Sequence, residues 1–102
     1  MIVVVTNEAK ADLVEIGEFI RPHHPARAIT FVDELLDRCS LLVEMPRAYP
    51  LVPRYEGHGI RRCTYRDYLI FYRVMDDLIE VIHILHGARN YEVLLFPDDL
   101  SA

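Results

Sequence analysis

Three strand-like segments follow one another with almost nothing between them, and this spacing constrains the fold more than any other feature. The segments are rich in β-branched and aromatic residues and comprise residues 60–66, 68–75 and 78–86. Only Asp67 separates the first pair, and only Asp76 and Asp77 separate the second. A parallel connection needs about a dozen residues or more, so links this short require antiparallel hairpins. The sequence therefore predicts a three-stranded antiparallel meander.

A short strand and two amphipathic helices are predicted ahead of the meander. Residues 2–5 form a β-branched run typical of a buried strand, and Thr6 suits the N-cap of a helix because its hydroxyl can accept from free amides. Apolar residues then recur at helical spacing, at Ala9, Leu13, Ile16 and Ile20 and again at Ala28, Val32, Leu35, Cys39 and Leu42. Pro22 marks the end of the first helix, Pro25 suits the start of the second, and Pro46 stops it. The short connection predicts an antiparallel hairpin.

The remaining segments complete an α+β fold. Residues 46–59 contain three prolines and two glycines and are expected to form a loop, and residues 93–96 are expected to pack as a final turn or strand. A chain of 102 residues has room for one adequate core, so a single domain over residues 1–102 is expected. We predict one sheet, made of the N-terminal strand and the meander, with the helix hairpin packed on one face.

The composition is typical of a folded cytoplasmic protein. Hydrophobic residues make up 52% of the chain and charged residues 26%. No apolar run approaches the roughly 20 residues of a membrane-spanning helix, and Met1 is not followed by a basic leader. Cys39 and Cys63 lack the spacing of a zinc site or a disulfide framework. We therefore expect a cytoplasmic chain with no metal, no other cofactor and no membrane contact.

Positive charge is concentrated in the middle of the chain, although the net charge is -5. Residues 47–75 carry six basic and two acidic side chains, whereas residues 1–46 carry four and eight and residues 76–102 carry one and six. All six are arginines, namely Arg47, Arg54, Arg61, Arg62, Arg66 and Arg73. The guanidinium fork suits carboxylate or phosphate partners, so this basic island is compatible with a binding surface. It is equally compatible with a solvated sheet face that offsets acidic helices.

The order of these elements and three segments of the sequence resemble the ParE branch of the ParE/RelE toxin superfamily. The similarity lies in GIRRCTYRDYLIFYRVMDDLIEVIHILHGARN at residues 59–90, and in AKADLVEIGEFI and PARAITFVDELLDRCSLLVEMPRAYP before it. It spans nearly the whole chain. The resemblance implies a small cytosolic toxin that is held inactive by an antitoxin encoded beside it, usually a ParD-like protein whose C-terminal part folds onto the toxin.

The same resemblance implies two different activities, because RelE-like members cut mRNA in the ribosome whereas ParE-like members poison DNA gyrase. RNA cleavage needs groups that move protons and stabilise a crowded phosphate. His83, His86, Arg61, Arg73 and Tyr91 are candidates, but the only lysine, Lys10, lies in the first predicted helix. An acidic chain is also poorly suited to contacts with ribosomal RNA. We therefore expect gyrase inhibition by protein contact, with no catalytic residue and no sequence-specific nucleic-acid binding. A ribosome-dependent endoribonuclease and a non-toxic relic that only binds antitoxin are the alternatives.

The two histidines near the end of the meander are not expected to form one site. His83 and His86 are three residues apart on a predicted strand, so their side chains point to opposite faces unless a bulge intervenes. Similar ParE sequences usually have arginine at the position of His83, so no family role is carried over to it. His86 is interpreted as a satisfied polar residue at the end of a strand.

Arginines of the meander and residues after it are the candidate contact sites. Arg61, Arg62 and Arg73 are expected to face antitoxin carboxylates, with structural pairing to nearby acidic residues as the alternative. Arg89 follows Gly87 where the last strand leaves the sheet. It is expected to face gyrase together with a small, partly apolar tail that contains Tyr91, Leu94, Leu95 and Phe96. The alternative role of this tail is packing over the sheet edge.

Overall fold

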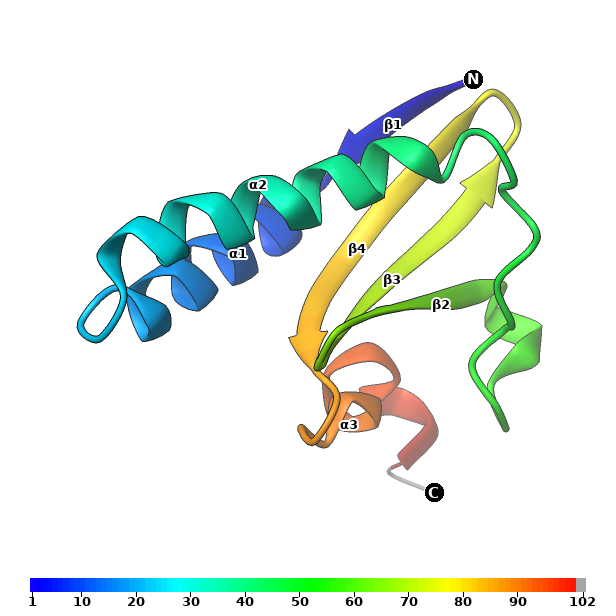
Figure 1. The fold of residues 1–102 in the computed structure, drawn as a ribbon. Helices are drawn as coiled ribbons and strands as arrows, with labels where there is room; N and C mark the ends of the chain where they lie inside the picture. The colour runs from blue at the N-terminus through cyan, green and yellow to red at the C-terminus, as the bar shows by residue number, and fades with distance from the viewer. Residues whose placement is uncertain (101–102) are drawn as a thin grey trace.

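The short links fold as expected, and the three segments form an antiparallel meander. In this computed structural model, which describes residues 1–100, the strands are β2 (Ile60–Tyr65), β3 (Tyr68–Met75) and β4 (Leu78–His86). The tight turns between them place Arg66 and Asp76 at positive φ, 52° and 26°. β1 (Ile2–Val5) completes a four-stranded sheet of order β1-β4-β3-β2, in which β1 runs parallel to β4. The predicted α+β architecture is confirmed (Figure 1).

Two long helices cover one face of this sheet. They are α1 (Asn7–Ile20) and α2 (Pro25–Leu41), which lie antiparallel and extend past the edge of the sheet (Figure 1). Thr6 caps α1, because its hydroxyl accepts a hydrogen bond from the Ala9 N–H at 3.2 Å. The same hydroxyl donates to the carbonyl oxygen of Ile82 at 3.1 Å, so the start of α1 is fixed to β4. α2 ends at Leu41, earlier than Pro46 requires, and turns continue the chain from there.

A bulge in β4 changes which side chains face the helices. Phe71 lies opposite His83 and Tyr72 lies opposite Val81, which leaves Ile82 without a partner on β3. As a result Val81 and Ile84, three residues apart, both join the core under the helices. Regular alternation would have placed them on opposite faces.

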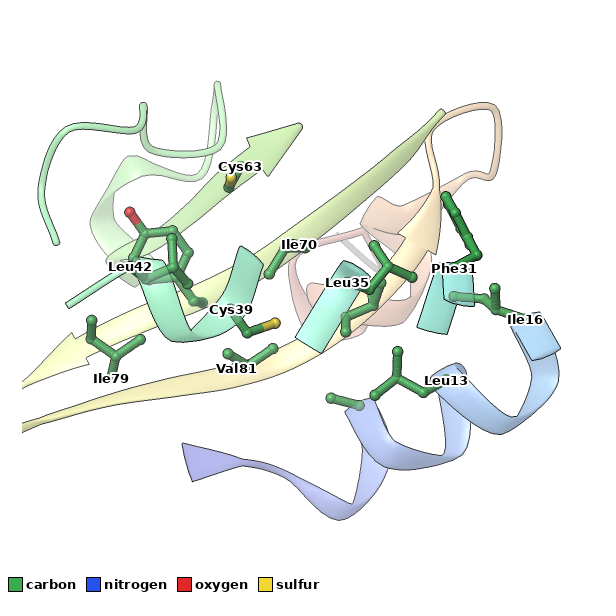
Figure 2. Packing of buried hydrophobic residues seen from close by; sticks show 13 residues of the cluster. Leu13, Ile16, Phe31, Leu35, Cys39, Leu42, Cys63, Ile70, Ile79 and Val81 are labelled. Carbon is green, nitrogen blue, oxygen red and sulfur yellow. The ribbon is translucent and has the colours of Figure 1, made fainter. Parts of the chain in front are cut away.

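The main core lies between the helix hairpin and the sheet, and its buried side chains interdigitate as Figure 2 shows. Leu13 and Ile16 of α1 and Leu35 of α2 are at most 6% exposed, as their helical spacing predicted. Ile20 and Val32 are only partly buried at the margin of this core. Tyr72 is fully buried, and its hydroxyl donates to the carbonyl oxygen of Pro46 at 2.7 Å. This bond ties the chain after α2 to the centre of the sheet.

A second, smaller core covers part of the opposite face. Its buried members are Val52, Ile60, Phe71, Leu85 and Phe96. Residues 46–59 are ordered along the edge of β2, where the Val52 N–H donates to the Ile60 carbonyl oxygen at 2.9 Å. The chain after β4 forms α3 (Tyr91–Leu95), a short helix rather than the expected turn or strand. Short 3₁₀ turns occupy Glu56–His58 and Pro97–Leu100. Within the described residues, no helix is long and apolar enough to cross a membrane.

Candidate functional site

The three arginines expected to contact an antitoxin lie on two different faces of the sheet. Arg61 is opposite Tyr72 in the β2–β3 register, so it belongs to the face under the helices. Its Nη1 donates to the carbonyl oxygen of Tyr49 at 2.8 Å and to that of Arg47 at 3.3 Å. Arg61 therefore fixes the chain after α2 against β2, which is a structural role.

Arg62 and Arg73 share the opposite face. Arg62 donates to the hydroxyl oxygen of Tyr91 at 2.9 Å, and Arg73 donates to a carboxylate oxygen of Glu80 at 2.9 Å. The buried Nε of Arg73 has no hydrogen-bond partner within residues 1–100. Both arginine residues are partly exposed. The three arginines together do not form one continuous surface.

The residues expected to face a target also separate, and the expectation of a projecting tail is wrong. Phe96 is 2% exposed and stacks on Tyr55 with ring centroids 4.1 Å apart. The Tyr91 ring lies 4.9 Å from that of Phe71, and Leu95 packs against the same core. The physical reason is that Phe71 and the other apolar side chains on this face need cover, which α3 provides. Leu94 remains 41% exposed.

His83 and His86 serve separate structural contacts. The Nδ1 of His83 donates to a carboxylate oxygen of Asp12 at 2.7 Å, a pairing across α1 and β4. His86 packs edge-on against Tyr68 with ring centroids 5.3 Å apart, and its Nδ1 accepts from the Ala88 N–H at 3.1 Å. The bulge at Ile82 precedes both histidines, so the pairing with β3 is regular from His83 to His86, and their contacts differ. No cluster of three potential metal ligands occurs in the part of the chain that the structure describes.

Arg89 lies instead in a pocket of about 430 Å³ between α1 and the end of β4. Asp12, Glu15, Ile16 and Phe19 line it from α1, Tyr68 from β3, and Ile84, Leu85, His86 and Arg89 from β4 and the turn after it. The sequence indicated Arg89 as a target contact and His86 as a candidate for RNA cleavage, but not their neighbours from α1 and β3. The available signal was Phe19, a large aromatic residue outside the apolar stripe of its helix.

A charged cluster joins α2 to the end of β2. The carboxylate of Glu34 pairs with Arg27 and accepts a hydrogen bond from the Tyr65 hydroxyl at 2.5 Å. Hydrogen bonds from Arg27 and then from Tyr65 lower the pKa of Glu34 to about 2. The Arg38 guanidinium lies over the Tyr65 ring, 5.0 Å from its centroid. This cluster fixes Tyr65 against α2.

Comparison with known proteins gives a consistent answer. The profile of the family described as "ParE toxin of type II toxin-antitoxin system, parDE" matches residues 3–91. A structure of a chromosomal ParDE toxin-antitoxin system from P. aeruginosa is 21% identical, has a TM-score of 0.74, and covers 84% of this chain and 95% of that one. The RelBE2 toxin-antitoxin complex from Mycobacterium tuberculosis is 19% identical with a TM-score of 0.61, covering 82% and 94%. No curated protein matches in sequence.

Proposed function

Because this chain belongs to the ParE toxin family of type II toxin-antitoxin systems, we propose that it binds DNA gyrase in the cytoplasm and blocks replication. It acts by protein contact, without a cofactor and without cleaving a bond itself. A ParD-like antitoxin encoded beside it neutralises it.

The observation that supports this proposal is that polar side chains of the sheet are hydrogen-bonded to other groups of the protein. His83 is bonded to Asp12, Arg61 to backbone carbonyl oxygens, and Arg73 to Glu80. A catalytic acid or base must be free to exchange a proton with its substrate. A cationic side chain that stabilises the transition state must be free to approach the phosphate. Groups held in structural pairs are poorly placed for either task, which supports contact over catalysis.

The ribosome-dependent endoribonuclease is the second candidate, and the pocket beside α1 is the observation that favours it. His86, Glu15 and Arg89 line that pocket together. Purified ribosomes with a bound message separate the two activities by primer extension. Codon-specific cleavage by the wild-type chain, lost in His86→Ala, is the outcome that this alternative requires. A non-toxic relic predicts neither activity and no growth arrest.

We propose that the antitoxin binds the half of this sheet face that α3 does not cover. Two rows of side chains cross it in register, Arg73, Glu80 and Val4 in one and Met75, Leu78 and Ile2 in the other. Ile2 is 63% exposed, Val4 40% and Met75 44%. The outer edge of β1 pairs with no strand within residues 1–100. An apolar segment with carboxylates can add to this edge or lie across this face, with its charge toward Arg73.

Co-purification with the product of the adjacent gene tests this assignment. We expect a stable complex whose affinity falls as salt is raised, since the Arg73 contact is partly exposed. Val4→Asp and Arg73→Glu are expected to weaken the complex. Arg54→Glu changes an exposed arginine in the loop before β2 and serves as the charge-matched control. A complex insensitive to both salt and Arg73→Glu would exclude this surface.

A further inference from the structure

A pocket lies between α1 and the end of β4 and is lined by residues from both elements. Its floor is apolar, formed by Ile16 and Ile84 from the core under the helices, which are at most 6% exposed. Phe19 and Tyr68 form aromatic walls. A pocket of about 430 Å³ is large enough for a branched or aromatic side chain with part of its backbone. The corner in which it lies, between α1 and the lower end of β4, can be followed in Figure 1.

The walls of this pocket are held in place before any partner arrives. Asp12, on the wall formed by α1, accepts from the Ile84 N–H at 2.9 Å and from His83 at 2.7 Å. The Thr6 hydroxyl fixes the start of the same helix to β4. A preformed pocket binds with a smaller loss of conformational entropy than one that must be assembled.

The rim of the pocket carries exposed charged groups of both signs that have no partner among the described residues. Phe19 is 76% exposed, an unusual position for a large aromatic side chain. Neither Glu15 nor Arg89 has an ion pair or side-chain hydrogen bond with another described residue. His86 accepts at Nδ1 from Ala88, so the proton of the neutral ring resides on Nε2 and is free to be donated. Cationic and acidic groups thus flank an apolar floor.

We propose that this pocket receives an apolar anchor side chain from a segment of the toxin's target protein. A carboxylate beside the anchor pairs with Arg89, and a basic residue on its other side reaches Glu15. This inference rests on the proposed function only in assuming that the chain acts by contact with a protein target. The antitoxin surface proposed above lies on the opposite face of the sheet, so the two sites are separate.

Two variants and two matched controls test the pocket. Phe19→Asp and Arg89→Glu change exposed residues of the rim. Ile29→Asp and Arg21→Glu make the same chemical changes at exposed positions of a second groove, between α1 and α2. The readouts are growth arrest on expression without antitoxin, the concentration of purified toxin that halves supercoiling by gyrase, and binding to the co-encoded antitoxin.

We expect each rim variant to need about 30-fold more toxin for the same inhibition, as loss of a hot-spot side chain does, while antitoxin binding and circular dichroism stay unchanged. The control variants are expected to inhibit as the wild type does. Rim variants that remain fully toxic overturn the pocket inference and leave the gyrase proposal standing. Rim variants that lose antitoxin binding while folded also overturn it. If the wild-type toxin never affects gyrase, loss of growth arrest in the rim variants with messages intact in the wild type supports the pocket and rejects gyrase as the target. Message cleavage by the wild type that the rim variants lose overturns the pocket inference in favour of a catalytic site.

Discussion

The carboxylate of Asp12 on α1 accepts hydrogen bonds from the Nδ1 of His83 and from the backbone N–H of Ile84 on β4. Both donors lie beyond Val81, where β1 stops pairing with β4. Asp12 therefore accepts the hydrogen bond of a buried backbone N–H of β4 that lies beyond the end of β1. It also joins α1, the part of β4 after the bulge and the wall of the pocket.

Asp12→Ala is expected to lower the free energy of unfolding by about 1 to 3 kcal/mol, because the buried Ile84 N–H loses its acceptor. Urea unfolding followed by circular dichroism measures this change. Glu15→Ala, an exposed carboxylate on the same helix, is the matched control and should shift stability by no more than about 0.5 kcal/mol. Equal effects of the two substitutions would mean that the Asp12 contacts carry no net stabilisation.

Phe96→Ala is expected to destabilise the chain by about 3 to 5 kcal/mol, since it leaves a cavity between Tyr55 and the second core. Val93→Ala on the exposed side of α3 is the control and should have little effect. A fully stable Phe96→Ala variant would contradict the packing of α3. For the same reason, truncation after Asn90 does not isolate target contact from folding, because it exposes Phe71 and Leu85.

Much of the fold could be predicted from local patterns in the sequence, namely the lengths of the links and the spacing of apolar residues. The links between β2, β3 and β4 have two residues or fewer, so only antiparallel hairpins could connect these strands. The helical spacing of Leu13, Ile16 and Leu35 identified the buried faces of the two helices. Asp12 shows the limit of such patterns. It lies among charged positions of its helix, yet it is 9% exposed because of donors more than 70 residues away.

The candidate site was less accessible to sequence reasoning because it depends on register. The bulge at Ile82 leaves no mark in the sequence, and it determines which of the residues after Val81 face the helices. Alternation alone could not show that Arg61 and Arg73 lie on opposite faces. Arg89 was identified from its place after Gly87, but its neighbours Glu15, Phe19 and Tyr68 come from other elements.

The cluster around Glu34 predicts a pH dependence of stability. Arg27 and Tyr65 lower the pKa of this carboxyl from 4.5 to about 2. A depressed pKa in the folded state contributes stability above pH 4.5 that is lost as pH falls toward 2. The stability difference between wild type and Glu34→Gln is therefore expected to shrink as the pH falls across that window. A difference that stays constant from pH 7 to pH 3 would contradict the Glu34 contacts.

We propose that this chain poisons gyrase, and an assay with purified components tests this proposal. The toxin is mixed with gyrase and supercoiled DNA, and in parallel with ribosomes carrying a message, each with and without the co-encoded antitoxin. We expect covalent gyrase–DNA cleavage complexes that the antitoxin prevents, with the message intact. Cleavage of the message at codon boundaries, with gyrase supercoiling unaffected at the same toxin concentration, would contradict it and assign the chain to the endoribonucleases.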